Sequence, residues 1–172
     1  MTQVELQAAL VNDGFKASKK PEHLNAILDL YRLYVQMADQ ISHRRQAANS
    51  FFLSIDTAIV AAIGYLMIEK HALPFKDLVF FLPIFGGIIS YVWYRLVRSY
   101  RDLNGGKFKV VHCLEQLLPV RPYDAEWKAL GEGKDRKLYF PFTHIEMSLP
   151  WAFVFAFALI LILISTGRVV VQ

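Results

Sequence analysis

The chain has 172 residues, a formal net charge of +4 and 55% hydrophobic residues. A soluble domain is typically about 45–50% apolar. The excess gathers in three blocks, which is typical of membrane segments and leaves no remaining piece large enough for a comfortable enzyme domain. The single cysteine, Cys113, excludes an intramolecular disulfide and a two-cysteine metal motif. Residues 1–49 are polar or amphipathic, so we expect no signal peptide, and the first span should direct its own insertion.

The N-terminal region, residues 1–49, predicts two helices. A short amphipathic stretch loses its pattern at residues 12–14, and Pro21 and Glu22 suit the first turn of a longer helix. Apolar and small residues then recur at alternating three- and four-residue spacing, which predicts a helix-packing face. We expect this helix to continue into the membrane without a break. The face comprises Leu24, Ile27, Tyr31, Tyr34, Ala38, Ile41 and Ala48, and is interrupted by Arg45.

Three spans follow, at residues 50–68, 78–97 and 149–166. Each is close to the roughly 20 apolar residues that cross the hydrocarbon core. The first two are joined by residues 69–77 alone, so they should form an antiparallel hairpin. Ser148 and Pro150 suit the cap and first turn of the third span.

Residues 98–148 form the predicted helical segment between spans 2 and 3. The helix of span 2 should continue to residue 118, weakened at Gly105 and Gly106, and present Phe108, Val111 and Leu114 to the N-terminal helix as an antiparallel pair. Pro119 and Pro122 should end it. A short helix capped by Asp124 is expected at 123–130, and a charged turn at 131–136.

The distribution of lysine and arginine predicts the orientation. Sixteen of the 19 such residues lie in residues 1–50 and 95–148, so both segments should be cytoplasmic. The N-terminus is then inside, and the third span with its tail, residues 149–172, ends outside. Aromatic residues at the end of span 2 and the start of span 3 agree with this assignment. The expected fold is all-α: a polytopic membrane protein with three transmembrane helices and a helical cytoplasmic region.

Two blocks of sequence resemble a known family. The run YRLYVQMADQISHRRQAANSFFL, residues 31–53, is similar to the entry to the first span in the RipA family of small octameric bacterial membrane proteins and in the two-span SLATT effector modules. Residues 99–146 strengthen the likeness, and the third span favours RipA-like proteins. The resemblance implies an octameric ring in the bacterial inner membrane.

Asp56, with Ser54 and Thr57, is a candidate intramembrane polar site. A carboxylate in hydrocarbon costs about 2.5–3.5 kcal/mol on insertion scales, so Asp56 should face protein or water, or be protonated. One interpretation is a proton or cation site on a central pathway. The other is a polar contact to Ser54, Thr57 or a neighbouring subunit.

Basic residues flank the spans. Arg44, Arg45, Arg95 and Arg98 are interpreted as topology determinants or lipid-headgroup contacts. Arg45 falls on the apolar face of its helix, so an acid on a packed helix, Glu115 or Glu126, is an alternative partner.

Pro83, Gly86 and Gly87 in span 2 predict either tight packing of the hairpin or a bend beside a pore. The turn Gly131–Lys137 lacks the spacing of a phosphate loop, and the histidines show no zinc spacing. We therefore expect no catalytic, cofactor or metal site.

Two functions remain open. The first is a non-enzymatic homo-oligomeric scaffold or regulator whose partners are lipid and further copies, with no nucleic acid, and whose subunits join mainly through the cytoplasmic helices. The second is a pore-forming or ion-conducting effector gated from the cytoplasm, in which Asp56, Ser54 and Thr57 should share a wet axis.

Overall fold

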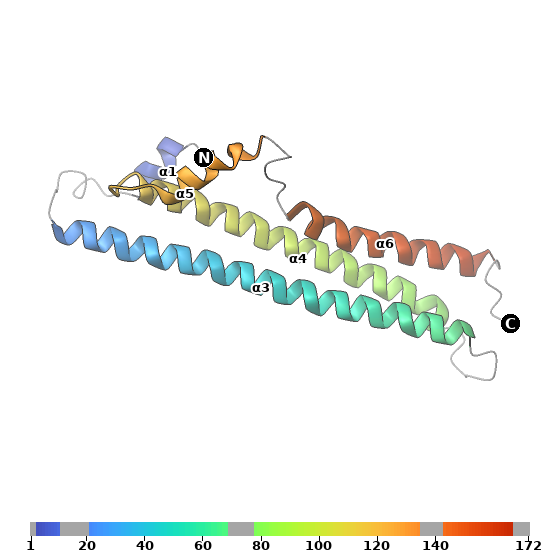
Figure 1. Ribbon diagram of the computed structural model, residues 1–172. Helices are drawn as coiled ribbons and strands as arrows, with labels where there is room; N and C mark the ends of the chain where they lie inside the picture. Colours follow the sequence, from blue (N-terminus) through green and yellow to red (C-terminus); the bar gives the residue numbers. More distant parts are fainter. Residues whose placement is uncertain (1–2, 11–20, 69–77, 135–142, 167–172) are drawn as a thin grey trace. The chain divides into compact units, whose positions relative to one another are not determined.

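The computed structural model describes residues 3–10, 21–68, 78–134 and 143–166, and every regular element in them is helical (Figure 1). No strand occurs within these ranges, which confirms the all-α prediction. The elements are α1 (Gln3–Leu10), α3 (Pro21–Ile68), α4 (Leu78–Glu115), α5 (Pro122–Ala129), the 3-10 helix η1 (Gly131–Gly133) and α6 (Thr143–Ser165).

Three of these helices contain a stretch that is long and apolar enough to cross a membrane. They are Glu22–Ile68, Val79–Glu115 and Ile145–Ser165, with mean hydropathies of 2.0, 1.5 and 2.5 over their most apolar windows. The three predicted spans are therefore confirmed. As expected, α3 begins at Pro21 and runs without a break into the first span. Helix α4 continues through Gly105 and Gly106, where we had expected a weakness, but it ends at Glu115 rather than at the predicted residue 118.

The helix that contains the third span begins earlier than predicted. Helix α6 starts at Thr143, so Pro150 lies inside the helix rather than in its first turn. The Ser148 hydroxyl donates to the carbonyl oxygen of Ile145 at 2.9 Å instead of capping the helix. The apolar pattern starts at residue 149, but polar residues before it continue the same helix.

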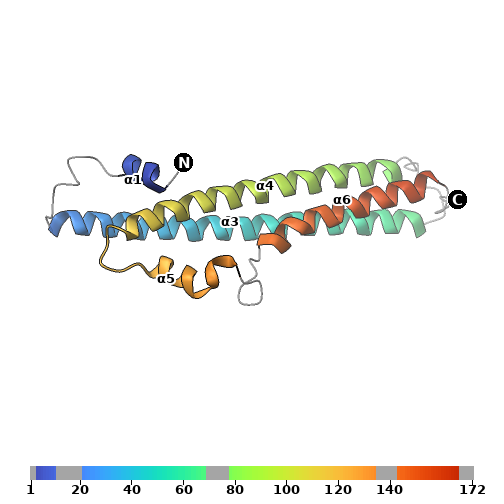
Figure 2. The ribbon, with the colours of Figure 1, turned by 90° about the horizontal axis from the view of Figure 1, so that it is seen from above.

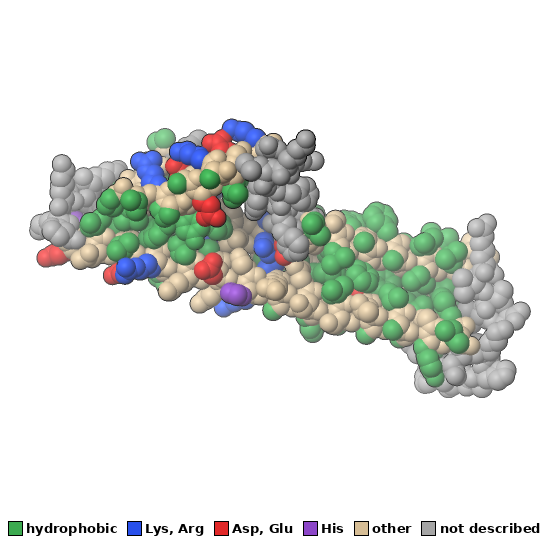
Figure 3. Space-filling view, viewed as in Figure 1, with side chains coloured by type: hydrophobic (Ala, Val, Ile, Leu, Met, Phe, Trp, Pro, Cys, Tyr) green, Lys and Arg blue, Asp and Glu red, His purple; other side chains and the backbone are tan. Residues whose placement is uncertain are grey.

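The described chain divides into two compact units. The polar unit comprises residues 1–43 and 100–141, and the membrane unit comprises residues 44–99 and 142–172. Helices α3 and α4 each contribute to both. Figure 3 shows charged side chains gathered over the elements of the polar unit and hydrophobic side chains over those of the membrane unit.

In the membrane unit, the second half of α3, the first half of α4 and α6 lie side by side (Figures 1 and 2). Its core consists of Ile59, Ile63 and Phe157, which are 8%, 2% and 1% exposed. Lipid is as apolar as these side chains, so close van der Waals packing, rather than exclusion of water, holds such helices together.

In the polar unit, the first half of α3 and the second half of α4 are antiparallel. The Lys107 ammonium lies 5.1 Å from the ring centroid of Tyr34. Most of the predicted packing residues are buried or half-buried among the described residues of this unit, but Leu24 is 43% exposed. The buried ones are Ile27, Ala38, Ile41, Val111 and Leu114, and the half-buried ones are Tyr31, Tyr34 and Phe108.

Helix α5 is not capped as the sequence predicted. Its N-cap residue is Arg121, which makes no side-chain capping bond. Asp124 lies in the first turn and pairs with Lys128 at 2.8 Å. The predicted hairpin loop at 69–77 and the second part of the charged turn, from residue 135, lie outside the described residues.

Candidate functional site

Asp56 is buried inside the membrane unit and contacts one polar side chain there. Both Asp56 and Ser90 are 0% exposed. The Ser90 Oγ lies 2.7 Å from Asp56 Oδ2 and 2.9 Å from the carbonyl oxygen of Gly86. The contact joins α3 to α4, so the carboxyl group faces the interior of one chain.

The contacts of Asp56 can all be satisfied by a neutral carboxylic acid. A hydroxyl group has one proton, so Ser90 cannot donate to Asp56 and to Gly86 at the same time. Both contacts become hydrogen bonds if Asp56 is protonated, donates to Ser90 Oγ, and Ser90 donates to Gly86. The second carboxyl oxygen, Asp56 Oδ1, is buried and accepts no hydrogen bond. An ionised carboxylate with an oxygen left unpaired would be costly in this apolar environment.

Ser54 and Thr57 do not join Asp56. Both are exposed, and their hydroxyl groups donate within α3, Ser54 to the Ser50 carbonyl at 2.8 Å and Thr57 to the Leu53 carbonyl at 2.7 Å. The predicted three-residue polar site is therefore wrong as a cluster. Helical periodicity places Asp56 on the inner face of α3 and the two hydroxyl residues on its outer face.

A second polar cluster ties all three helices of the membrane unit together. The Trp93 indole donates to Asn49 Oδ1 at 2.8 Å, and the Asn49 amide donates to Glu146 Oε1 at 3.1 Å. Arg45 Nε lies 3.2 Å from Glu146 Oε2, and the two side chains are 17% and 10% exposed. This ion pair holds by charge and proximity, because its N–H is not aligned into a hydrogen bond.

Arg45 therefore has a different partner from those we predicted. The acid is Glu146 on α6, not Glu115 or Glu126. The other flanking arginines, Arg44, Arg95 and Arg98, are exposed. Of these, Arg95 lies 3.4 Å from the hydroxyl oxygen of Tyr91. Their predicted roles in topology or lipid contact stay predictions.

Gly86 permits a close approach of α4 to α6. A Cβ atom at residue 86 would lie 2.5–2.7 Å from three ring atoms of Phe157, whereas one at Gly87 would meet nothing within 4 Å. The tight packing that we expected within the hairpin is thus made with the third span. Pro83 is buried within α4, which continues past it.

Glu115 is the centre of the polar unit. This side chain is 0% exposed and accepts hydrogen bonds from the backbone N–H groups of Tyr123, at 2.8 Å, and Asp124, at 3.1 Å. The Tyr31 hydroxyl donates to it at 3.1 Å, and His112 Nδ1 lies 3.5 Å away. A carboxylate on α4 therefore caps α5 and anchors α3.

The pKa values of the two tyrosines beside Glu115, Tyr31 and Tyr123, are raised. Burial raises the pKa of Tyr31 above its ordinary value, and the hydrogen bond to Glu115 raises it further. Burial also raises the pKa of Tyr123, with a smaller contribution from nearby carboxylates. Both phenols are therefore kept neutral, as their hydrogen-bond and ring contacts require.

The described residues contain no group of three side chains that could hold a metal ion. Cys113 is buried, and burial raises the pKa of its thiol, so it is a poor nucleophile. In the described part of the charged turn, Gly131, Glu132 and Gly133 have positive φ angles, and the Glu132 carboxylate pairs with Lys134. The ion pair with Glu132 leaves Lys134 unable to bind a phosphate group in this arrangement.

Sequence reasoning missed four residues of these clusters: Ser90, Asn49, Trp93 and Glu146. A signal was present for one of them, because Asn49 lies seven residues before Asp56 and so shares its helix face. The register between helices decides which residues of α4 and α6 lie opposite that face. This register cannot be obtained from the periodicity of one helix.

The apolar helices and their internal polar contacts define an integral membrane protein. Comparison with protein families matches residues 28–166 to the octameric membrane protein family, 8xMP. The match covers well over half of the chain, so the chain belongs to this family. Searches of curated proteins and of solved structures find no match. The predicted octameric class is confirmed, whereas the narrower likeness to RipA proteins and SLATT modules stays a prediction.

Proposed function

We propose that this protein is a non-enzymatic octameric scaffold or regulator of the bacterial inner membrane, with its N-terminus in the cytoplasm. Family membership supports the octamer. The concentration of lysine and arginine in residues 1–50 and 95–148 supports the orientation.

One observation carries the proposal: the acidic side chain within the first span, Asp56, has its polar partner inside the same chain. Asp56 is 0% exposed and contacts Ser90, while the hydroxyl groups of Ser54 and Thr57 bond to their own helix. A conducting path lined by Asp56 would need that carboxyl group on an outer surface of the subunit. This arrangement favours a structural role for the membrane unit.

The exposed apolar surface of the polar unit supports a scaffold. Leu30, Leu33, Leu103, Val120 and Trp127 are 42–68% exposed. Large apolar side chains exposed on a polar region typically mark contacts with other chains. We expect these residues to meet neighbouring subunits or a cytoplasmic partner.

We also propose that the protein is not an enzyme. Among the described residues, two inward-facing carboxyl groups already have structural partners: Glu115 accepts hydrogen bonds from two backbone N–H groups and a phenol, and Glu146 contacts Asn49 and Arg45. A general acid or base needs an open position for a substrate.

Recordings from planar bilayers containing the purified octamer test this function. We expect no conductance above that of the protein-free bilayer, both for the wild type and for Asp56→Leu. Asp56→Asn is the matched control, because it keeps the shape of the carboxyl group. Robust conductance by the wild type that is lost in Asp56→Leu would overturn the scaffold role and establish the pore.

A further inference from the structure

The membrane unit has an apolar groove on its surface between α4 and α6. The groove has a volume of about 400 Å³ and is lined by apolar side chains together with the Tyr91 ring. On the α4 side it includes Gly87, where a Cβ atom would meet nothing within 4 Å, so the helix backbone is bare there. On the α6 side it includes Ala158 and Leu161. Such a groove admits a helix at short distance.

We propose that this groove receives α3 of the neighbouring copy, so that the octamer is closed inside the membrane by one repeated contact of α3 with the α4–α6 groove. The occupant is a second copy because the chain belongs to an octameric family. This inference goes beyond the proposed function, since it holds for a scaffold and for a pore alike.

Symmetry requires two different surfaces to meet. All copies of a chain with one topology have the same orientation in the membrane, which excludes two-fold axes in the membrane plane. Eight equivalent copies must then be related by rotation about the membrane normal. A cyclic ring is built from heterologous contacts, in which one surface of each copy binds a different surface of the next. The groove is one such surface, and a second must lie elsewhere on the membrane unit.

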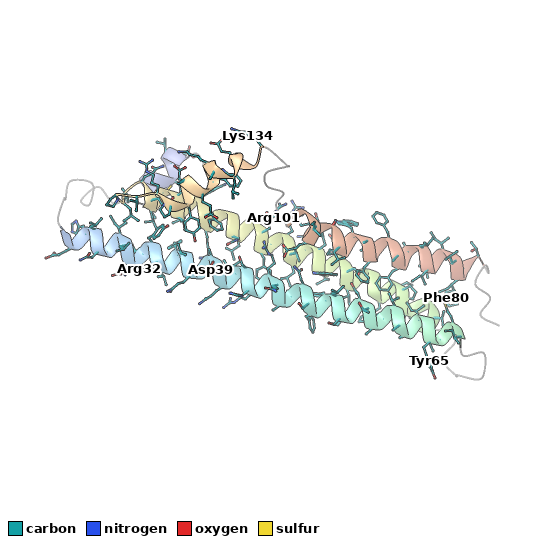
Figure 4. All side chains as sticks on the ribbon, in the orientation of Figure 1. Arg32, Asp39, Tyr65, Phe80, Arg101 and Lys134 are labelled. Carbon is teal, nitrogen blue, oxygen red and sulfur yellow. The ribbon has the colours of Figure 1, made fainter. Side chains whose placement is uncertain are left out.

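The outer face of α3 fits as the second surface. Asp56, Ile59 and Ile63 point to the core, and the residues on the opposite side of the helix are exposed and mostly small. Figure 4 shows Tyr65, on this outer face, pointing away from α4 and α6. The exposed faces of α4 and α6 instead carry bulky side chains suited to lipid. The outer face of α3 comprises Ser50, Ser54, Thr57, Ala58, Ala61, Tyr65 and Ile68, of which only Tyr65 and Ile68 are large.

The polarity of this α3 face also suits the groove. The hydroxyl groups of Ser54 and Thr57 already donate to carbonyl oxygens of their own helix, so they need no partner from an apolar lining. Neither surface carries a charged side chain. Docking therefore buries the hydroxyl groups of Ser54 and Thr57 without leaving them unsatisfied.

Depth in the membrane matches as well. Rotation about the membrane normal keeps every residue at its own depth. Asp56 lies beside Ser90, and Gly86 beside Phe157. Because α3 and α4 are antiparallel, Ala61 lies near the depth of Gly86, and so does Ala158, which follows Phe157. Ala61 of one copy is thus level with the groove of the next.

Disulfide cross-linking in native membranes tests the contact. In a Cys113→Ser background, oxidation of the pair Ala61→Cys and Ala158→Cys should give a ladder of covalent oligomers reaching eight copies, and each single variant should stay monomeric. The matched control is Ala61→Cys with Phe85→Cys, because Phe85 is 55% exposed but does not line this groove. That control should also stay monomeric.

A second pair, Ser54→Cys with Tyr91→Cys, probes the same contact at another depth. Native mass spectrometry establishes that each variant still forms an octamer before oxidation. Dimers from Ala61→Cys alone would show α3 against α3 and overturn the proposal. So would intact octamers in which neither pair cross-links, since lipid would then fill the groove.

Discussion

The ring of Phe157 fills the space that a side chain at Gly86 would need. Three of its atoms lie 2.5–2.7 Å from the position of a Cβ atom on Gly86, and Phe157 is 1% exposed. Gly86→Ala should therefore force α6 away from α4 and destabilise the protein by about 1–3 kcal/mol, as overpacked cores are. Thermal unfolding in detergent measures this change.

Gly64→Ala is the control for Gly86→Ala, because a Cβ atom on Gly64 meets nothing within 4 Å. Alanine favours a helix over glycine by up to about 1 kcal/mol, so this variant should be as stable as the wild type or more stable. Equal stability of Gly86→Ala and Gly64→Ala would contradict the close packing of α4 on α6.

Replacing Asp56 by asparagine should leave the stability of the protein nearly unchanged, whereas removing its partner Ser90 should lower it. If the carboxyl group is neutral, Asp56→Asn keeps a donor toward Ser90 and should unfold close to the wild-type temperature. Ser90→Ala removes the partner and should cost about 0.6–1.7 kcal/mol, the range for hydrogen bonds between membrane helices.

Infrared spectroscopy detects the proton on Asp56 directly. The wild type should show the carbonyl stretch of a buried carboxylic acid at neutral pH, and Asp56→Asn should lack it. A wild-type spectrum with only carboxylate bands from this residue would show that Asp56 is ionised.

Arg45 and Glu146 should be energetically coupled. Each is at most 17% exposed, so removing one leaves the other charge poorly solvated. We expect Arg45→Gln or Glu146→Gln alone to lower the free energy of unfolding by about 1–3 kcal/mol. The double variant should lose less than the sum of the two. Additive losses in this double-mutant cycle would mean that the ion pair contributes nothing.

Alkaline pH should remove the stabilising contact of Tyr31. The pKa of Tyr31 is raised in the folded protein, chiefly by burial and then by the hydrogen bond to Glu115. A tyrosine in the unfolded chain ionises near pH 10, so about this pH the folded and unfolded states begin to differ in protonation. The stabilisation is therefore complete below about pH 10 and is lost as the pH rises further. Thermal unfolding of the wild type and Tyr31→Phe should differ most at neutral pH.

The stability difference between these two proteins should shrink above about pH 10. There the Tyr31 phenol of the wild type ionises more readily in the unfolded chain than in the folded protein, which favours unfolding, whereas Tyr31→Phe has no phenol at this position. Tyr65→Phe, which removes a hydroxyl from a side chain that is 60% exposed, is the control. A stability difference between wild type and Tyr31→Phe that is constant across this pH range would contradict the buried contact.

The sequence predicted the helices well because their signals are local. Pro21 starts α3, no proline follows it in that helix, and each apolar block is close to the length that crosses the hydrocarbon core. The start of α6 was missed because residues 143–148 are mostly polar, with only Ile145 and Met147 apolar, although they are helical. Hydropathy indicates where a chain enters the lipid, but the helix that crosses the membrane can begin several residues before that point.

The contacts of the site could not be predicted in the same way. Asp56 was recognisable as a polar residue within a span, but its partner Ser90 is set by the register of α3 against α4. Arg45 and Glu146 are brought together by the third helix, so no spacing along the chain indicates the pair. Glu115 caps α5 from a different helix, which the local capping pattern at Asp124 could not indicate.

The number and direction of the spans is the central claim, and sided labelling of single cysteines tests it most directly. In a Cys113→Ser background, spheroplasts are treated with a membrane-impermeant maleimide. A cysteine at Gln172 should react in intact spheroplasts, and a cysteine at Val4 should react only after lysis. Reaction of both positions from the same side would show an even number of crossings and contradict the three-span fold.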